Sequence, residues 1–291
     1  MKLITSKKFF IFQIYIILII FLFTSIFIYI SKKLNLNSLN QLLYNLQIDK
    51  IKSEKFETII LGDSTGGNAI DASYYSFLSK SNTGNLSLTG GLSEAGLAIL
   101  ENANKDKLKN IIIISDLDIW LRNPRSGYKF FIEEFENYNN FFYHYYKNLN
   151  LLDISRITRM FIEKYVLNKE VISIENDYIK QFESKPENKD YYLLLENIKY
   201  EKFNFLRDIF EYCEIKNLNC VHANGPIIKN FCENISFQPY LDEIYKQFDL
   251  LNINYTKKVF CLENDEYGDS ISHVNPSKKK IFTKKYFEIL Q

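Results

Sequence analysis

Apolar and polar positions divide the chain into segments with different periodicities. Phe9 to Ile30 is a continuous apolar run without a charged residue. As a helix it would measure about 33 Å, close to the thickness of the hydrocarbon core of a membrane. The run ends without the small-residue cleavage site of a secretory signal peptide. We therefore predict a retained single-pass membrane anchor within residues 1–33.

A second pattern follows the anchor. Residues 34–55 carry apolar side chains at helical spacing, which predicts an amphipathic stem before the main domain, residues 56–291. The flanking charges constrain the orientation only weakly, because lysines before the apolar run are balanced by Lys32 and Lys33 after it. We expect the N-terminus inside and the main domain on the extracytoplasmic side.

In the main domain, short and uniformly apolar runs alternate with helical patterns. Such runs are typical of strands that are buried on both faces of a parallel sheet. We therefore predict the α/β class, with a three-layer, doubly wound parallel sheet. The predicted strands are residues 56–62, 84–89, 110–116 and 218–224, with 253–260 as a weaker fifth, and the clearest helices are residues 92–109 and 203–216.

Residues 124–205 interrupt this alternation. Their pattern is mainly helical and dense in aromatic residues, which predicts a helical insertion with a small core of its own. A lid or substrate groove over the sheet is the alternative, because long insertions in compact domains are often functional.

Composition narrows the classes of partner. With 46% hydrophobic and 24% charged residues, the chain can bury enough apolar surface to fold. A net charge of +1 argues against nucleic acid as a partner. The four cysteines allow three disulfide pairings and lack the spacing of a zinc site, so we expect neither a metal nor a cofactor. They are Cys213, Cys220, Cys232 and Cys261.

The first predicted strand ends in a Gly-Asp-Ser turn. Ligands of open parallel sheets bind beyond the carboxyl ends of the strands, which is where Ser64 stands. Gly66 and Gly67 would then leave room for a substrate beside the main chain. The alternative is a tight strand-to-helix turn, capped by Ser64, that has no chemical role. The turn lacks the motifs of nucleotide-binding loops, which makes a phosphate site the weaker reading.

A base and an acid for Ser64 stand near the other end of the chain. A serine hydroxyl needs a base to become a nucleophile, and an imidazole serves best when a carboxylate orients it. Of the three histidines, His144 lies in an aromatic run and His222 in a predicted strand, whereas His273 lies in a polar loop beside Asp269. We predict that Ser64, His273 and Asp269 form a catalytic triad.

At these residues the chain resembles the SGNH, or GDSL-type, serine esterases and acyltransferases. The stretches "ILGDST", "NLSLTGG" and "DSISHVNPSKKKIFT" are similar to three blocks of the membrane-anchored branch that acylates extracellular polysaccharides. The resemblance implies a flavodoxin-like SGNH fold and makes Gly90 the second oxyanion donor beside the backbone N–H of Ser64. It also implies a multi-pass membrane acyltransferase as the donor partner.

One block departs from the family pattern. The family's asparagine amide is replaced by aspartate in "ISDLDIW", and an ionised carboxylate cannot donate a hydrogen bond. Either Asp118 has another duty or Asn123 reaches the oxyanion. The acid lies four residues before His273 rather than three, which leaves Asp265 as an alternative to Asp269.

Together, the anchor and the resemblance predict a membrane-anchored serine acyl-ester hydrolase or O-acyltransferase that acts on cell-envelope polysaccharide. The alternative is a catalytically silent SGNH-like module that binds glycan or organises an envelope assembly.

Overall fold

The structure is a computed structural model, and contacts divide the chain into two units. The smaller unit comprises residues 1–39 and 150–171, and the larger one residues 40–149 and 172–291. The described residues are 10–16, 18–19, 22–23, 26, 39–89, 94–103, 106–122, 162, 174–175, 178–179, 181 and 195–291. Much of the predicted anchor lies outside them. Among the residues that are described, no helix is both long and apolar enough to cross a membrane.

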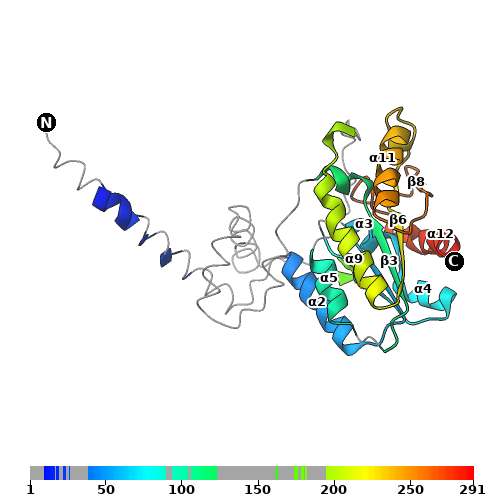
Figure 1. The fold of residues 1–291 in the computed structure, drawn as a ribbon, viewed down its shortest axis with the longest axis horizontal. Coiled ribbons are helices and arrows are strands. Elements are labelled where there is room, and N and C mark those ends of the chain that lie inside the picture. The colour runs from blue at the N-terminus through cyan, green and yellow to red at the C-terminus, as the bar shows by residue number, and fades with distance from the viewer. Residues whose placement is uncertain are drawn as a thin grey trace. The chain divides into compact units, whose positions relative to one another are not determined.

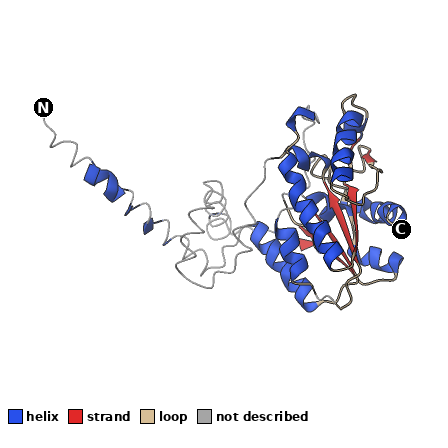
Figure 2. Cartoon of the chain, viewed as in Figure 1, coloured by secondary structure: helices blue, strands red, loops and turns tan. Residues whose placement is uncertain are grey.

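A four-stranded parallel sheet forms the centre of the larger unit (Figure 1, Figure 2). Its order is β2-β1-β3-β6, and Ile60 on β1 is paired with Asn85 on β2 and with Ile112 on β3. The apolar residues of β1 and β3 are buried, which explains why neither strand alternates between apolar and polar positions. The strands are β1 (Thr58–Gly62), β2 (Thr83–Asn85), β3 (Asn110–Ser115) and β6 (Asn219–Asn224).

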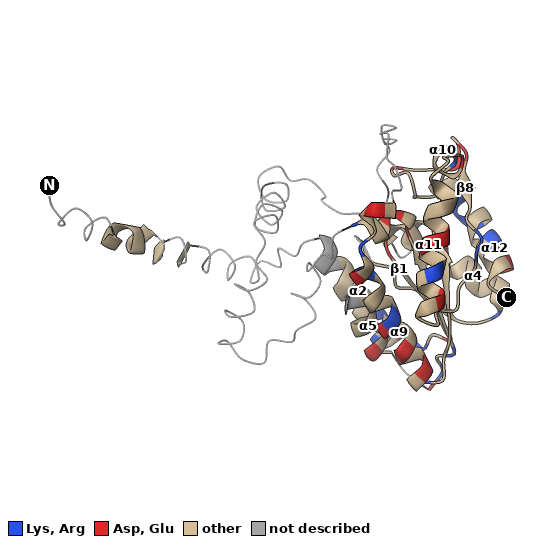
Figure 3. Ribbon diagram, turned by 45° about the horizontal axis from the view of Figure 1, so that its top comes forward, with Lys and Arg blue, Asp and Glu red and all other residues tan. Residues whose placement is uncertain are grey.

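Helices surround the sheet, so the predicted α/β class is confirmed. One group of contacting helices is α3 (Ser64–Ala69), α4 (Ala72–Ser79) and α12 (Lys279–Ile289), and another is α5 (Glu94–Glu101) with α9 (Phe203–Ile215). Figure 3 shows both acidic and basic positions along the helices, in keeping with the small net charge.

The predicted stem is a helix that packs into the domain. It forms α2 (Leu39–Ser53), whose Leu43 and Ile51 are buried. The side chain of Gln47 donates a hydrogen bond to the carbonyl of Ser87, just beyond β2. The stem is therefore part of the hydrophobic core rather than a spacer that stands clear of the sheet.

The predicted fifth strand is wrong. Within residues 253–260 only Tyr255 pairs with the sheet, through a single bridge to His222. The chain instead forms β8 (Cys261–Leu262), which pairs with β7 (Ile227–Ile228) in a separate two-stranded sheet. Two further helices, α10 (Lys229–Cys232) and α11 (Phe237–Leu250), precede it.

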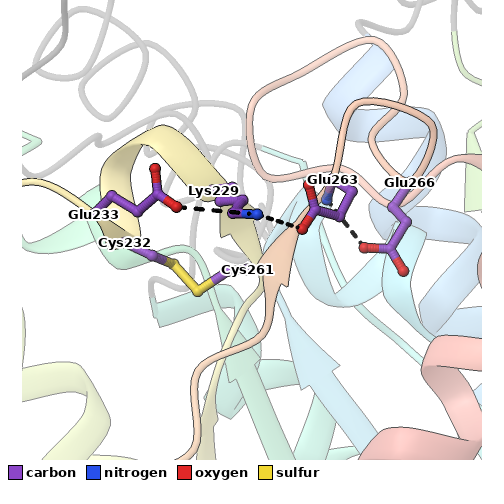
Figure 4. The surroundings of a disulfide bond; sticks show 6 residues. All are labelled: Lys229, Cys232, Glu233, Cys261, Glu263 and Glu266. Atoms are coloured by element: carbon purple, nitrogen blue, oxygen red, sulfur yellow. Dashed lines mark hydrogen bonds and ion pairs between the residues drawn. A yellow bond between two sulfur atoms is a disulfide. The ribbon is translucent and has the colours of Figure 1, made fainter.

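Two disulfides select one of the three pairings that the sequence left open. Cys213 on α9 is bonded to Cys220 on β6, and Cys232 on α10 is bonded to Cys261 on β8. Figure 4 shows the second bond, next to an ion pair of 2.8 Å between Lys229 and Glu263. Both bonds connect a helix to a neighbouring strand.

Most of the predicted helical insertion, residues 124–205, lies outside the described residues. The described part contains the short antiparallel hairpin of β4 (Ile174–Glu175) and β5 (Tyr178–Ile179), followed by Gln181. It also contains two 3-10 turns, η4 (Leu195–Asn197) and η5 (Tyr200–Lys202), before α9 begins at Phe203. The pattern did not predict the hairpin.

Candidate functional site

The turn from β1 into α3 places Ser64 at the first position of the helix. Asp63 is the helix cap: its Oδ1 accepts a hydrogen bond from the backbone N–H of Thr65 at 2.9 Å. Its Oδ2 accepts a second, also 2.9 Å long, from the N–H of Asp116 just after β3. Asp63 therefore joins the carboxyl ends of two neighbouring strands. Ser64 remains partly exposed while the rest of α3 is buried.

The glycines of this turn serve close packing. A Cβ atom at Gly62 or Gly66 would overlap the carbonyl oxygen of Ile114 on β3, and one at Gly67 would overlap the ring of Tyr178. The predicted role of Gly66 and Gly67, to leave room for a substrate, is therefore wrong. The turn is tight, as in the alternative reading, but its cap is Asp63 rather than Ser64.

The second half of the site is a short loop between Tyr267 and Val274, which are paired as an antiparallel bridge. The backbone N–H of Gly268 donates to the carbonyl of His273 at 2.7 Å and closes the loop. Inside it, Nδ1 of His273 lies 2.7 Å from Oδ1 of Asp269. The structure thus brings the predicted base and acid together.

The alternative acid, Asp265, has a different partner. Its carboxylate accepts a 2.7 Å hydrogen bond from Nζ of Lys278 and is well exposed to solvent. Asp269, by contrast, is largely shielded from solvent. Of the two carboxylates, only Asp269 can orient the ring of His273 in this arrangement.

The two halves of the site meet at a buried pair of hydroxyl groups. Thr65 donates a hydrogen bond from Oγ1 to Oγ of Ser272 at 3.1 Å, and Ser272 donates to Oδ2 of Asp116 at 2.7 Å. The residue after Ser64 is therefore bonded to the residue before His273. Within the described part of the chain, no hydrogen bond joins the hydroxyl of Ser64 to the ring of His273.

Helix α12 fixes this junction from a second side. The buried ammonium group of Lys279 donates to the carbonyl of Gly67 at 2.9 Å. The backbone N–H of Asp71, the cap of α4, donates to Oγ1 of Thr283 at the same distance. The first crossover of the sheet is thereby held against the last helix of the chain.

Asp118 pairs with a cation of the protein, as expected if it does not bind the oxyanion. Its carboxylate forms an ion pair with Arg122, which also lies 3.0 Å from Asp116. Burial, together with the negative charge of Asp116, raises the pKa of Asp63 to about 6 and raises the pKa of Asp118 well above its usual range. Both carboxyl groups therefore bind a proton more readily than an exposed aspartate, although Arg122 offsets part of the effect.

The two remaining predicted donors, Gly90 and Asn123, lie outside the described residues, so their roles stay predictions. His144 also lies outside them. His222, which lies in a predicted strand, is fully buried on β6, and its Nε2 lies 2.9 Å from Oγ of Ser115. Burial lowers the pKa of His222 to about 3, so the ring is neutral at physiological pH.

A cavity of about 730 Å³ lies away from these residues. It is bordered by the Cys213–Cys220 disulfide and by Asn219 at the start of β6. Because the strands are parallel, this is the opposite edge of the sheet from Ser64, which follows the end of β1. Within the described ranges, no three His, Cys, Asp or Glu side chains are grouped as metal ligands.

Sequence reasoning missed three residues of the site. Ser272 and Lys279 lie inside the stretch "DSISHVNPSKKKIFT", but the predictions drawn from that stretch concern Asp269 and His273 and give neither residue a role. Gln181 lies in the aromatic insertion, far from both motifs in the sequence. Only their contacts in the folded chain identify them.

No protein-family profile and no curated protein sequence matches the chain.

Proposed function

We propose that the chain is a serine acyl-ester hydrolase or O-acyltransferase with an SGNH-type, flavodoxin-like fold. One observation carries the proposal: the Asp269–His273 pair is connected to the Ser64 turn through the hydrogen bond between Thr65 and Ser272. This junction lies at the carboxyl edge of the parallel sheet, where open α/β sheets bind ligands. A nucleophile, a base and an orienting acid are the groups that acyl transfer requires.

In the proposed mechanism, Oγ of Ser64 attacks the carbonyl carbon of an ester while Nε2 of His273 accepts the hydroxyl proton. Asp269 holds Nδ1–H and stabilises the imidazolium ion. The backbone N–H of Ser64 stands at the first helical position, where the helix offers it no acceptor, and it donates to the oxyanion. The tetrahedral intermediate then expels the alcohol, which takes the proton from His273, and an acyl-Ser64 remains.

Transfer of the acyl group from Ser64 to an acceptor completes the reaction. Water would make the protein a hydrolase, and a glycan hydroxyl would make it a transferase. In either case His273 removes the proton of the acceptor as it attacks the acyl carbon, and Ser64 recovers its proton when it leaves. The role of Gly90 as the second oxyanion donor belongs to this proposal.

The proposed substrate is an acylated cell-envelope polysaccharide, and the proposed location is extracytoplasmic, tethered by a single-pass anchor. The apolar run Phe9 to Ile30 supports a tether. The two disulfides support an oxidising compartment, because such bonds are rare in the reducing cytosol. A multi-pass membrane acyltransferase would supply the acyl group if the chain is a transferase.

The experiment that tests this function uses the full chain in detergent and a fluorophosphonate probe, which phosphonylates activated serine residues. We expect labelling in the wild type, none in Ser64→Ala, and normal labelling in Ser270→Ala. Ser270 is the matched control because it lies in the same loop as His273. Labelling that persists in Ser64→Ala, or that is absent from the wild type, would contradict the proposal.

A second candidate function is a silent module that holds glycan in the same place. It is favoured by the contact between Asp118 and Arg122, which engages the carboxyl group of Asp118 within the protein rather than with an oxyanion. This candidate predicts that Ser64→Ala leaves the cellular phenotype intact, whereas replacement of aromatic residues in the insertion removes it. The acyl-transfer proposal predicts the loss of the phenotype in Ser64→Ala.

A further inference from the structure

Gln181 connects the two halves of the site. It follows the β4–β5 hairpin and uses its whole side-chain amide. Its Nε2 donates to Oδ1 of Asn68 at 2.9 Å and to the carbonyl of Val274 at 2.6 Å. Its Oε1 accepts from the backbone N–H of Asp269 at 3.3 Å. A glutamine amide has two N–H groups and one oxygen, and all three are used here.

The connection reaches the nucleophile through Asn68. While Oδ1 of Asn68 accepts from Gln181, its Nδ2 donates to the carbonyl oxygen of Ser64 at 2.7 Å. The two amides therefore form a relay from the backbone of Ser64 to the backbone of Asp269. The other branch ends at Val274, which directly follows His273. All three residues of the proposed triad, or their immediate neighbours, are held by this relay.

The surrounding backbone is shaped to admit this segment. A Cβ atom at Gly268 would overlap Oε1 of Gln181, and one at Gly67 would overlap the ring of Tyr178. Tyr178 is buried, and its hydroxyl lies 3.2 Å from Oγ1 of Thr89. Gly67, in the Ser64 turn, thus leaves space for Tyr178, and Gly268, in the His273 loop, leaves space for Gln181. Tyr178 and Gln181 belong to neither half of the site.

We infer that Gln181 is a positioning residue, which sets the placement of Asp269 and His273 relative to Ser64. The inference rests on the proposed acyl-transfer function. Gln181 would touch neither substrate nor reacting atoms, and it acts through Asn68 and through the backbone of the loop. Misplacement of a reacting group by about 1 Å can cost roughly 100-fold in rate.

The test compares two variants that keep the size of the side chain. Gln181→Met removes every hydrogen bond of the amide but preserves packing. Gln181→Glu places an oxygen opposite two acceptors, Oδ1 of Asn68 and the carbonyl of Val274. Gln247→Ala is the control, because Gln247 donates to Glu243 on α11 and has no contact with the relay.

The first readout is kinetic and uses the full chain with 4-nitrophenyl acetate and the fluorophosphonate probe. We expect kcat and the labelling rate to fall about 10- to 100-fold in both Gln181 variants, with KM changed less than about twofold. Gln247→Ala should equal the wild type. A purely structural role would lower the amount of folded protein without a lower rate per folded molecule, and that result would overturn the inference.

The second readout does not depend on activity. In a proton NMR spectrum, a histidine Nδ1–H that is hydrogen-bonded to a carboxylate is protected from exchange and gives a separate low-field signal. The chain has only three histidines, so this signal can be assigned. We expect this signal in the wild type, Ser64→Ala and Gln247→Ala, and its loss or broadening in both Gln181 variants. An unchanged signal in the Gln181 variants would refute the inference. Full activity of Ser64→Ala with loss of the signal in Gln181→Met would refute the proposed chemistry but leave the placement by Gln181 standing.

Discussion

The hydroxyl of Thr65 donates a hydrogen bond to the hydroxyl of Ser272, a residue 207 positions later in the chain. The hydroxyl of Ser272 in turn donates a hydrogen bond to the carboxylate of Asp116, and all three side chains are buried. Since a buried polar group without a partner is costly, this short chain of hydrogen bonds has one favourable arrangement. It holds the residue after Ser64 against the residue before His273.

The first prediction concerns this junction. Thr65→Val removes one neutral hydrogen bond and should lower the free energy of unfolding by about 1 kcal/mol. Ser272→Ala also leaves the Asp116 carboxylate without this donor, and it should cost about 2–3 kcal/mol. Both values can be measured by urea denaturation. Thr256→Val is the control: Oγ1 of Thr256 is buried without a partner, so this change should be neutral or stabilising. Equal costs for Thr65→Val and Ser272→Ala would count against the role of Asp116.

The second prediction concerns the orienting acid. Asp269→Asn should lower kcat with 4-nitrophenyl acetate by roughly 100- to 10,000-fold, because the amide favours the wrong tautomer of His273. Asp265→Asn removes a carboxylate of the same segment whose partner is Lys278, and it should leave kcat unchanged. If Asp265→Asn has the larger effect, the assignment of the acid is wrong.

The third prediction concerns the buried carboxyl of Asp63. Its pKa of about 6 in the folded chain lies above the value of about 3.9 expected when unfolded. The folded state therefore binds more protons between these values, and the stability contributed by Asp63 falls as the pH rises from about 4 through about 6. Asp63→Asn removes this titration and also loses the acceptor of the Asp116 N–H.

Denaturation of the wild type and Asp63→Asn between pH 4 and pH 7 measures this effect. The advantage of the wild type should be largest near pH 4 and should shrink by on the order of 2 kcal/mol by pH 7. An advantage that is constant with pH would show that the pKa of Asp63 is not shifted on folding, and one that grows with pH would show that it is lowered; either result would contradict the prediction.

The fourth prediction has the opposite sign and concerns His222. Its pKa of about 3 in the folded chain lies below the value of about 6.5 expected when unfolded. The unfolded state therefore binds more protons between these values, and stability is lost as the pH falls below about 6.5. His222→Gln places an amide next to Ser115 in place of the imidazole ring, and this amide cannot titrate in this range.

The wild type should lose stability relative to His222→Gln by on the order of 3 kcal/mol between pH 7 and pH 4. Parallel denaturation curves of the two proteins at each pH provide the measurement. A difference that does not depend on pH would mean that His222 reaches solvent in the folded state.

The sequence predicts the sheet best where burial is complete. The strands β1 and β3 are predicted because their apolar runs reflect burial on both faces. Strand β6 is predicted from a less apolar run, and its first residue, Asn219, is exposed. Strand β2 is shorter than predicted, although the backbone N–H groups of Leu86 and Leu88 still donate to the carbonyls of Ile60 and Gly62 on β1. The predicted fifth strand is not formed: the chain makes a single bridge to β6 there, at Tyr255.

In the candidate site, the sequence predicts the residues of the proposed triad better than the residues that hold them in place. Asp269 and His273 are close in the chain, so their pairing follows from spacing and a loop. Gln181 contacts both halves of the site across long separations in sequence, and no local pattern marks such a residue. Either Asp63 or Ser64 suits a helix cap, so the sequence alone does not assign it; the hydrogen bond from the backbone N–H of Thr65 to Asp63 does.

The most direct test of the account is the crystal structure of residues 40–291 or of the full chain after reaction with the fluorophosphonate probe. We predict a phosphonyl group on Oγ of Ser64, with Nε2 of His273 within hydrogen-bond reach of that oxygen, about 2.6–3.2 Å away. An unmodified Ser64, or an imidazole ring of His273 on the opposite side of the sheet from Ser64, would contradict the account.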